Sequence, residues 1–436
     1  MPIFGRPSPP RTQRIAIRHG GARLDTLSAA AAGISSAPGT MFAAVAVPAS
    51  TTAIRLCFGN CSNTPVPAGP FYVCPSTTWA DYANPTGGGA WKRGTFNYAG
   101  TPGDNLPVLP VSGSVYTATV PGNGGTVTDP GLVSPWWPAT DQAAVYYLSD
   151  VIPVDLLPRL DGRDGRILFI RVLWPQGASV ARGLPTPDMG VGDAYLGHGT
   201  GCLFKAGDNL LASSVSGTSP GGGMPFCWVE AITCEAGFQI VTGGDSQMQG
   251  DAGTGNAPFH LLSAYALQAV QAAPIGVLNA AWGGARLNQW FPHLLSTLDR
   301  VPASLVLIEG FSGNDNMELN SVADFRANAA WQIDRILAVR AMLDDRVPIV
   351  VTTPMPRNYS DPAYIAAWRA TREPIRALQG HNIHVLDLQT IGEDPAHPGQ
   401  WLPSMTSDGS GLHGGPLFNA TASAVFTPLL RRLLGL

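Results

Sequence analysis

Charged residues are scarce in this sequence, and no segment concentrates charge of one sign. Asp, Glu, Lys and Arg make up 13% of the 436 residues, and the formal net charge is -4. Proteins that bind nucleic acid or an anionic membrane surface carry a basic patch, and no block of Lys or Arg occurs here. We therefore expect no nucleic acid and no membrane surface as a partner.

Long apolar runs are lacking as well. A membrane-spanning helix needs about 18 or more consecutive apolar residues, and the chain has no such stretch. The N-terminal "MPIFGRPSPPRTQRIAIRHG" lacks the apolar centre of a secretory signal and indicates a proline-rich arm. We expect no membrane span and no signal peptide, while action outside the cell or at its surface stays open.

The spacings that bind metals or phosphates are missing too. The eight histidines show no H-x-x-x-H pair, and no glycine-rich loop ends in Gly-Lys-Ser/Thr. All six cysteines precede residue 235 without a strong zinc spacing, so disulfides of an exported protein and ordinary buried thiols both remain open. No metal and no cofactor is implied.

Glycine and proline are abundant instead, with 51 Gly and 39 Pro, which predicts many turns and loops. A chain of 436 residues exceeds the size of one ordinary core, so two domains are expected. We assign residues 1–40 to an N-terminal arm, 41–235 to a β-rich domain and 236–436 to a catalytic domain. The oligomeric state is left open.

The β-rich assignment depends on short apolar or alternating runs such as "MFAAVAV", "SVYTATV" and "RILFIRVLW". Loops such as "PTGGGAW" and "PGNGGTV" separate them. Short strands separated by turn residues favour an antiparallel sandwich or jelly-roll-like unit. Such a domain could bind carbohydrate, shape a cleft or mediate oligomers as an accessory unit.

After residue 236 the pattern changes to strand, loop and helix. The runs "FQIVTGG", "IGVLNAA", "SLVLIEG", "VPIVVTTPM" and "NIHVLDLQ" are nearly all apolar, as strands buried on both faces of a parallel sheet must be. Helices are expected between them, beginning near Ser321 and at Asp361-Pro362, and a last helical segment is expected to be interrupted at Pro428. Alternating strands and helices predict an α/β domain with three α/β/α layers around a parallel sheet.

Polar residues and glycines follow four of the five predicted strands. Ser246 comes after the first strand, Gly283 and Gly284 after the second, Asn314 after the third and His413 after the fifth. Ligands of such folds bind beyond the carboxyl ends of the strands. We therefore expect these groups to lie at one edge of the sheet and to form a site.

These blocks resemble a known family, the SGNH or GDSL hydrolases, and most closely its sialate O-acetylesterase-like carbohydrate esterases. That subgroup typically shows G-Q-S-N-M-x-G, then S-x-W-G-G-T-x-I-x-x-W, then a G-x-N-D type block, and then an Asp shortly before a His. The matching blocks here are GDSQMQG at 244–250, AWGGARLNQW at 281–290, SGND at 312–315 and DGSGLH at 408–413. The resemblance covers roughly the last 200 residues. It implies an SGNH-type, flavodoxin-like domain that hydrolyses esters without a cofactor.

The resemblance also implies a role for each matching residue. Ser246 would be the nucleophile and His413 the general base, because an imidazole that takes the hydroxyl proton activates a serine. The oxyanion hole would consist of the Ser246 N–H, the Gly283 N–H and the Asn314 amide, which stabilise the charge that develops on the carbonyl oxygen. Further residues expected near the substrate are Asp245, Gln247, Trp282, Gly284 and Arg286.

Asp408 departs from the family pattern. The family commonly has an Asp three residues before the histidine, where this chain has Ser410, and Asp408 lies five residues before His413. Glycines at 409 and 411 would let the loop fold back so that Asp408 orients the imidazole as the third member of a triad. The alternative is a solvated Asp408, with a backbone carbonyl orienting the ring.

Each of the other residues of these blocks has two possible roles. Asp245 is expected to fix the loop by accepting backbone N–H groups, more than to act as a second catalytic acid. Trp282, Trp290 and Arg286 could line a sugar-binding cleft, since aromatic faces stack on pyranose rings and guanidinium groups recognise carboxylates. The alternative is that the tryptophans pack the second crossover helix on the sheet. For Trp290 we expect packing of the helix on the sheet.

The expected reaction is hydrolysis of O-acyl esters, above all O-acetyl groups on carbohydrate, through an acyl-enzyme intermediate. The acetyl-carbohydrate substrate follows from the resemblance alone. Two alternatives stay open: an esterase or lipase acting on lipid or small aryl esters, and a non-catalytic surface or phage-tail-type binding protein with a decayed hydrolase domain.

Overall fold

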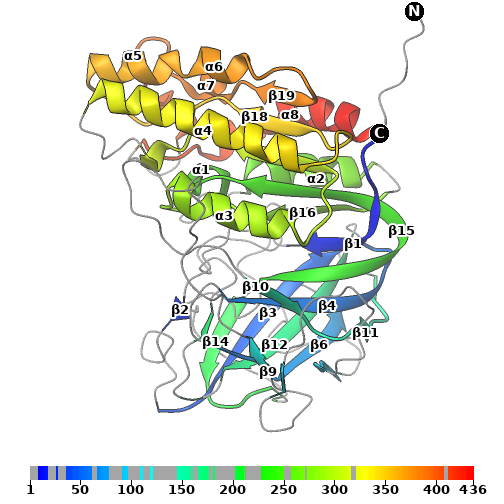
Figure 1. The fold of residues 1–436 in the computed structure, drawn as a ribbon. Helices are drawn as coiled ribbons and strands as arrows, with labels where there is room; N and C mark the ends of the chain where they lie inside the picture. Colours follow the sequence, from blue (N-terminus) through cyan, green and yellow to red (C-terminus); the bar gives the residue numbers. More distant parts are fainter. Residues whose placement is uncertain are drawn as a thin grey trace, which may run out of the picture. The chain divides into compact units, whose positions relative to one another are not determined.

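The structure is a computed structural model of the chain (Figure 1). The residues it describes are 8–17, 26–27, 36–60, 66–77, 91–96, 109–110, 118–120, 145–158, 160, 165–174, 176, 180–181, 202–210, 212, 227–249, 257–270, 273–315, 321–406 and 411–436.

The chain divides into two compact units. Unit 1 consists of Met1–Thr12, Gly237–Asp251 and Pro258–Leu436, and unit 2 consists of Gln13–Ala236 and Ala252–Ala257. The functional domains assigned above to residues 1–40, 41–235 and 236–436 stay predictions.

Unit 1 contains a parallel sheet. Residues 238–243 of β15 (Trp228–Gly243) pair in parallel with β16 (Ile275–Asn279) and with β17 (Leu305–Glu309). The sheet continues from β17 to β18 (Ile349–Thr352) and β19 (Ile383–Leu386), again in parallel. Every residue of β16, β17 and β18 is buried, as the nearly unbroken apolar runs predict. The prediction of an α/β unit with a parallel sheet is confirmed, while its flavodoxin-like three-layer form stays a prediction.

Helices occupy the segments between these strands and follow the last one. The helices of unit 1 are α1 (Ser246–Gln249), α2 (Phe259–Gln268), α3 (Leu287–Leu298), α4 (Val322–Met342), α5 (Pro362–Ala370), α6 (Arg372–Arg376), α7 (Leu388–Gly392) and α8 (Pro416–Leu434), with 3-10 turns at Gly313–Asp315 and Pro403–Met405. Helix α2 packs against α8, and α4 runs beside α5 (Figure 1). The carboxyl ends of the strands lead into the segments that carry the predicted site residues.

Two of the predicted helix starts are confirmed by their caps. The Ser321 hydroxyl accepts the Asp324 N–H at 3.1 Å at the start of α4. The Asp361 carboxylate accepts the Ala363 N–H at 2.8 Å at the start of α5, one residue before Pro362. A side-chain acceptor at this position satisfies one of the backbone N–H groups that the first turn leaves unpaired.

The predicted interruption of the last helix at Pro428 is wrong. Helix α8 runs through this residue from Pro416 to Leu434. Proline removes one intrahelical hydrogen bond, to the carbonyl of Ala424, and Ala424 and Pro428 are both exposed. Water can therefore solvate the carbonyl that loses its donor, while the opposite face of the helix stays packed.

Residues 8–12, the described part of the predicted N-terminal arm within unit 1, are anchored on that unit. The Ser304 hydroxyl donates to the Pro10 carbonyl at 2.5 Å, and the Arg11 guanidinium lies 4.6 Å from the centre of the Phe238 ring. These contacts fix the chain just before β1 (Thr12–Ile17).

Unit 2 contains antiparallel strands. β3 (Gly39–Val47) pairs with β12 (Arg166–Trp174) and β14 (Cys202–Ala206), and β12 pairs with β6 (Phe71–Ser76). The last strand of this sheet is β7 (Lys92–Arg93).

A second set of strands in unit 2 is built on β4 (Thr51–Asn60). It pairs antiparallel with β10 (Val145–Leu148), with β11 (Ile152–Pro153) and with residues 228–233 of β15. Shorter strands of the unit are β2 (Thr26–Leu27), β5 (Val66–Ala68), β8 (Leu109–Pro110), β9 (Ala118–Val120) and β13 (Val180–Ala181).

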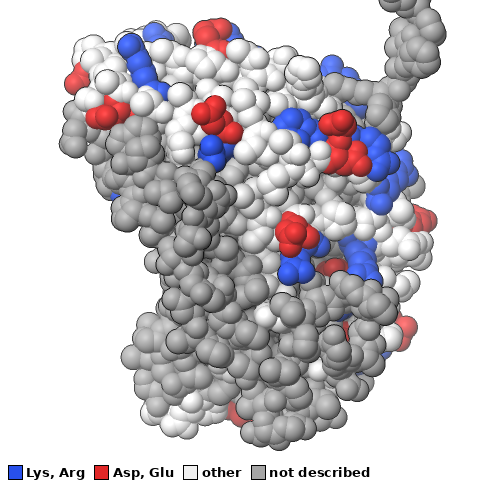
Figure 2. Space-filling view, viewed as in Figure 1, with Lys and Arg blue, Asp and Glu red and all other residues white. Residues whose placement is uncertain are grey.

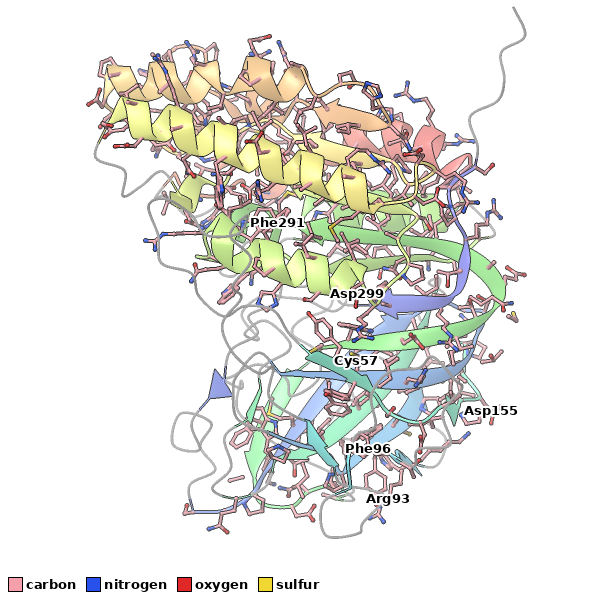
Figure 3. The ribbon with its side chains drawn as sticks, in the orientation of Figure 1. Cys57, Arg93, Phe96, Asp155, Phe291 and Asp299 are labelled. Atoms are coloured by element: carbon pink, nitrogen blue, oxygen red, sulfur yellow. The ribbon has the colours of Figure 1, made fainter. Side chains whose placement is uncertain are left out.

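An aromatic cluster joins the two sets. Phe58 of β4, Phe71 of β6 and Phe96, which is labelled in Figure 3, have ring centroids 5.4 to 5.8 Å apart. Tilted and edge-on pairs at this separation stabilise a core beyond the burial of their area. The sandwich or jelly-roll arrangement and the accessory role stay predictions.

On the face drawn in Figure 2, basic and acidic side chains lie next to one another at several places. Within the described part of the chain, no helix combines the length and apolarity needed to cross a bilayer. Cys234 is an exposed free thiol.

Candidate active site

The first predicted block forms a tight turn between β15 and the short helix α1. Gly244 follows the strand, and a Cβ atom there would lie 2.5 Å from the Met248 Cγ and 2.8 Å from the Glu309 Oε2. Only glycine fits at this point, because real Cβ atoms do not approach other atoms so closely. Ser246 is the first residue of α1 and is half-buried. The turn therefore positions its side chain while part of the residue stays exposed to solvent.

Ser246 and His413 lie together, although 167 residues separate them. The distance between Ser246 Oγ and His413 Nε2 is 2.9 Å, which is within hydrogen-bond range. His413 is also half-buried. A second link fixes the two segments, because the Gln247 side-chain amide donates to the carbonyl of Leu412.

The second block is joined to the turn through its backbone. The Trp282 N–H donates to the Gly244 carbonyl at 2.9 Å. The Asn279 Oδ1, just before this block, accepts hydrogen bonds from the Thr242 hydroxyl at 2.9 Å and from the Ala281 N–H at 3.1 Å.

The two glycines of the second block differ in their surroundings. A Cβ on Gly283 would lie 2.2 Å from the Gln249 Oε1, so Gly283 is next to α1. Gly284 has φ +76, a left-handed backbone that glycine adopts freely, and an added Cβ would meet nothing within 4 Å. Gly284 is exposed, so this part of the edge is open.

The third block places Asn314 between two partners. Its Nδ2 donates to the Ala285 carbonyl at 3.0 Å, and its Oδ1 accepts from the Arg357 Nη2 at 3.3 Å. Asn314 is half-buried. Hydrogen bonds therefore connect the segments of all four blocks, through Ser246 with His413, Gly244 with Trp282, and Ala285 with Asn314.

Asp245, beside the predicted nucleophile, is fully buried. Its Oδ1 accepts the Gln247 N–H at 2.8 Å, and its Oδ2 accepts from the Ser312 hydroxyl at 3.0 Å and from the Arg357 Nη2 at 2.9 Å. Three protein donors thus occupy this carboxylate. The arrangement favours the loop-fixing role of Asp245 over direct contact with a substrate.

Glu309, the last residue of β17, is a second buried acid at this point. Its Oε2 accepts the Asp245 N–H at 2.7 Å. Burial, and next the neighbouring Asp245 carboxylate, raise the pKa of Glu309 well above its usual value, although the Arg357 charge opposes this. The protonated, neutral form of Glu309 is therefore favoured next to the Asp245–Arg357 ion pair.

The remaining residues expected near a substrate differ in exposure. Gln247 and Trp282 are each 8% exposed, and the Trp282 ring packs edge-on against His293 with centroids 5.2 Å apart. Arg286 is half-buried at the start of α3, where its N–H donates to the Gln289 Oε1 at 2.9 Å. The sugar-binding roles of Trp282 and Arg286 stay predictions.

Trp290 is completely buried, and a Cβ on Gly243 would lie 3.1 Å from its ring. This is the packing of α3 on the sheet that the sequence suggested for Trp290.

Asp408 lies outside the described residues, so its membership of a triad stays a prediction. The described residues on either side of its segment pair with each other. Thr406 and Gly414 form an antiparallel bridge, and the Gly415 N–H donates to the Met405 carbonyl at 2.5 Å.

Sequence reasoning missed Glu309, Ser312 and Arg357. A signal for Glu309 was present, because it is the acid that ends the otherwise apolar run "SLVLIE" at the predicted ligand edge. Arg357 is likewise the charged residue of the segment "TTPMPRNY" that follows the fourth strand. Ser312 stands in the third block itself, but only its contact with Asp245 distinguishes it from a loop serine.

No protein-family model matches this chain, and no curated protein does so either. Among solved structures, the lipase/acylhydrolase from Enterococcus faecalis is 21% identical, with a TM-score of 0.32 over 45% of this chain and 96% of that chain. A carbohydrate acetylesterase family member from Sinorhizobium meliloti is 15% identical, with a TM-score of 0.33 over 46% of this chain and all of the other.

A carbohydrate esterase family 2 enzyme with a carbohydrate binding domain, from Corynascus thermopiles, is 14% identical. It covers 97% of this chain and 100% of its own length, with a TM-score of 0.32. TM-scores this low carry no weight for the function, which has to rest on the residues of this chain.

Proposed function

We propose that this chain is a serine ester hydrolase whose nucleophile is Ser246 and whose general base is His413. The observation that carries the proposal is the 2.9 Å distance between Ser246 Oγ and His413 Nε2 at the carboxyl edge of a parallel sheet. A hydroxyl within hydrogen-bond reach of an imidazole is the arrangement that activates serine for attack on a carbonyl carbon. Both residues are half-buried, so a bound ester can reach them.

The reaction follows from these two groups. The Ser246 Oγ bonds to the carbonyl carbon of the ester while its proton moves to the His413 Nε2. The tetrahedral intermediate then collapses, the bond to the alcohol oxygen breaks, and His413 returns the proton to the leaving alcohol. A water molecule attacks the acyl-enzyme, gives its proton to His413, and releases the carboxylic acid as Ser246 regains its proton.

The negative charge on the carbonyl oxygen requires preorganised donors. We assign this role to the Ser246 N–H, the Gly283 N–H and the Asn314 side-chain amide. Support comes from the hydrogen bonds that connect the three segments, in particular Trp282 N–H to Gly244 and Asn314 Nδ2 to Ala285. Loss of one such donor typically costs about 3 kcal/mol of transition-state stabilisation.

Asp408 is assigned as the residue that orients His413. The bridge between Thr406 and Gly414 supports this role, because it closes the base of the loop that carries both side chains. A carboxylate near Nδ1 would fix the tautomer that leaves Nε2 ready to accept the proton, and it would stabilise the imidazolium.

O-acetyl esters of carbohydrates are the proposed substrate class, on the sequence resemblance of the four blocks. The exposed Gly284 leaves open space at the second block, which also carries the half-buried Arg286. Unit 2 is proposed to be the accessory, carbohydrate-binding part of the chain.

The test measures acetate release from a panel of acetylated sugars and polysaccharides, together with hydrolysis of p-nitrophenyl esters of increasing acyl length. Ser246→Ala should abolish release, whereas Ser296→Ala, which removes a hydroxyl bonded to the His293 carbonyl on α3, should leave it unchanged. A steep fall in rate beyond acetyl or propionyl supports deacetylation. A preference for longer acyl chains would replace the acetyl proposal, and turnover that survives in Ser246→Ala would end the serine mechanism.

A further inference from the structure

Arg357 connects two of the catalytic segments from a loop that belongs to neither. It follows β18, its side chain is 4% exposed, and its Nη2 lies 2.9 Å from the Asp245 Oδ2 and 3.3 Å from the Asn314 Oδ1. Asp245 precedes the proposed nucleophile, and Asn314 is the proposed side-chain donor of the oxyanion hole. One buried guanidinium therefore contacts both.

The contact with Arg357 determines which way the Asn314 amide faces. A guanidinium has only donors, so the atom of the amide that faces it must be the oxygen. The nitrogen then lies on the other side, where one of its N–H bonds is directed to the Ala285 carbonyl at 3.0 Å. The second, which has no acceptor among the described residues, is left for a ligand. An amide rotated by half a turn would present its oxygen to the oxyanion and would repel it.

The guanidinium is itself confined. A Cβ on Gly313 would lie 2.1 Å from the Arg357 Nε and 2.5 Å from its Cζ, so the group packs directly on the backbone beside Asn314. On its other side it is paired with Asp245, which is fully buried. A planar fork of donors with fixed neighbours orients an acceptor more strictly than a flexible ammonium would.

The neighbouring residue extends this connection to the histidine segment. Asn358 has φ 54, and a Cβ on Gly411 would lie 1.5 Å from the Asn358 Nδ2. Its Oδ1 accepts the Trp401 N–H at 3.3 Å. The loop after β18 thus contacts the segments of Ser246, Asn314 and His413.

We propose that Arg357 is a positioning residue that holds the Asn314 amide with its N–H directed at the oxyanion, while the ion pair with Asp245 holds the guanidinium itself in place. The inference rests on the proposed ester hydrolysis at Ser246. Arg357 acts through Asn314 and does not contact the substrate.

The test is a double-mutant cycle on p-nitrophenyl acetate hydrolysis. Asn314→Ala should lower kcat about a hundredfold. Arg357→Met should lower kcat about tenfold or more and change KM less than about twofold, because the lost interaction acts in the transition state. In the Asn314→Ala background, Arg357→Met should lower kcat less than about threefold, since residues that act through one another are not additive.

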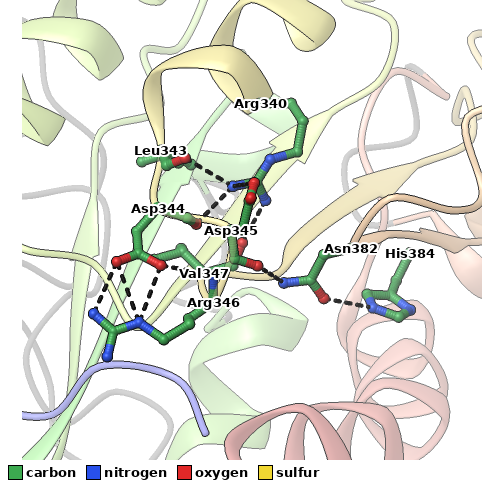
Figure 4. A network of polar contacts seen from close by, with 8 residues as sticks. All are labelled: Arg340, Leu343, Asp344, Asp345, Arg346, Val347, Asn382 and His384. Atoms are coloured by element: carbon green, nitrogen blue, oxygen red, sulfur yellow. Dashed lines mark hydrogen bonds and ion pairs between the residues drawn. The ribbon is translucent and has the colours of Figure 1, made fainter. Parts of the chain in front are cut away.

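Two further variants make the cycle decisive. Arg357→Lys keeps the charge opposite Asp245 but lacks the planar fork, so it should fold and still lose kcat non-additively with Asn314→Ala; it replaces Arg357→Met if the latter does not fold. Arg340→Met is the matched control, because it removes another hydrogen-bonded guanidinium away from the site. The Arg340 guanidinium donates to the carbonyls of Leu343, Asp344 and Val347 (Figure 4). Arg340→Met should leave kcat unchanged.

Additive losses in the cycle, or an unchanged kcat in a folded Arg357→Lys, would overturn the positioning role. Failure of the proposed function would give a different result. Ser246→Ala would then hydrolyse the ester as fast as the wild type, and the proposed role of Arg357 would be wrong as well.

Discussion

His260 makes the stability of unit 1 sensitive to acid. This residue of α2 is fully buried, and neither of its ring nitrogens has a hydrogen-bond partner among the described residues. Its ring packs edge-on against Phe259, at 5.4 Å between ring centroids. Burial alone lowers the pKa of His260 from 6.5 to about 3, because the charged imidazolium would lose its hydration without gaining a partner.

The direction and size of the effect follow from linkage. The folded chain keeps His260 neutral between pH 6.5 and about pH 3, whereas the unfolded chain binds a proton there. The contribution to stability is therefore complete above pH 6.5 and is lost as the pH falls. At about pH 5 the loss is about 2 kcal/mol, from about 1.4 kcal/mol for each pH unit below the unfolded pKa.

His260→Phe removes the titratable imidazole and places an apolar aromatic ring at the same buried position. Urea unfolding followed by circular dichroism at pH 7 and pH 5 should show that the variant loses about 2 kcal/mol less than the wild type over this interval. His381→Asn is the control, since His381 is exposed and has φ 46, which asparagine tolerates. An equal pH dependence of wild type and His260→Phe would refute the reasoning, because the buried ring would then have found a partner for its proton.

Three further predictions concern the site. Asp408→Asn should lower kcat about a hundredfold or more if Asp408 orients His413, and near-normal activity would assign that role to another group. Gly313→Ala should lower kcat and the melting temperature together, because the new Cβ would meet the Arg357 guanidinium at 2.1 Å; an unchanged kcat would show that Arg357 can move without consequence. Glu309→Gln should lose less stability than the wild type as the pH rises above the usual carboxyl value of 4.5, because a group with a raised folded pKa loses its contribution to stability between its unfolded and its folded pKa. The same pH dependence of the melting temperature in both proteins would show that the fold does not raise the pKa of Glu309.

The sequence predicted the strands of unit 1 and the edge at which the site lies. The apolar runs are long enough and uniform enough to specify buried parallel strands, and polar residues directly after them can only lie at the carboxyl edge. The contact between Ser246 and His413 does not follow from that topology alone, because α7 and the 3-10 turn at Pro403–Met405 lie between the end of β19 and His413.

The sequence could not show the polar cluster behind the turn that carries Ser246. Asp245 and Arg357 are 112 residues apart, and Asp245 and Glu309 are 64 apart. Their pairing depends on which side chains of adjacent strand ends face inward, and no periodicity encodes this. The sequence shows one acid at the end of β17 and one arginine in the segment after β18. It does not show that both contact Asp245.

The charge balance of this cluster explains why its two acids differ. Asp245 and Glu309 are both buried, and among the described residues Arg357 is the cation hydrogen-bonded to Asp245. Two buried carboxylates beside one guanidinium would leave one negative charge uncompensated, which costs several kcal/mol in the buried interior. Protonation of Glu309 removes that cost, and a protonated Glu309 can both accept the Asp245 N–H and donate to the Asp245 carboxylate. The same charge balance links the proposed role of Arg357 to the stability of the fold. If the Arg357 charge is removed, the side-chain partners left to Asp245 are the neutral Glu309 and the Ser312 hydroxyl. A loss of kcat in Arg357→Met can therefore be assigned to Asn314 only through the double-mutant cycle and the charge-preserving lysine variant.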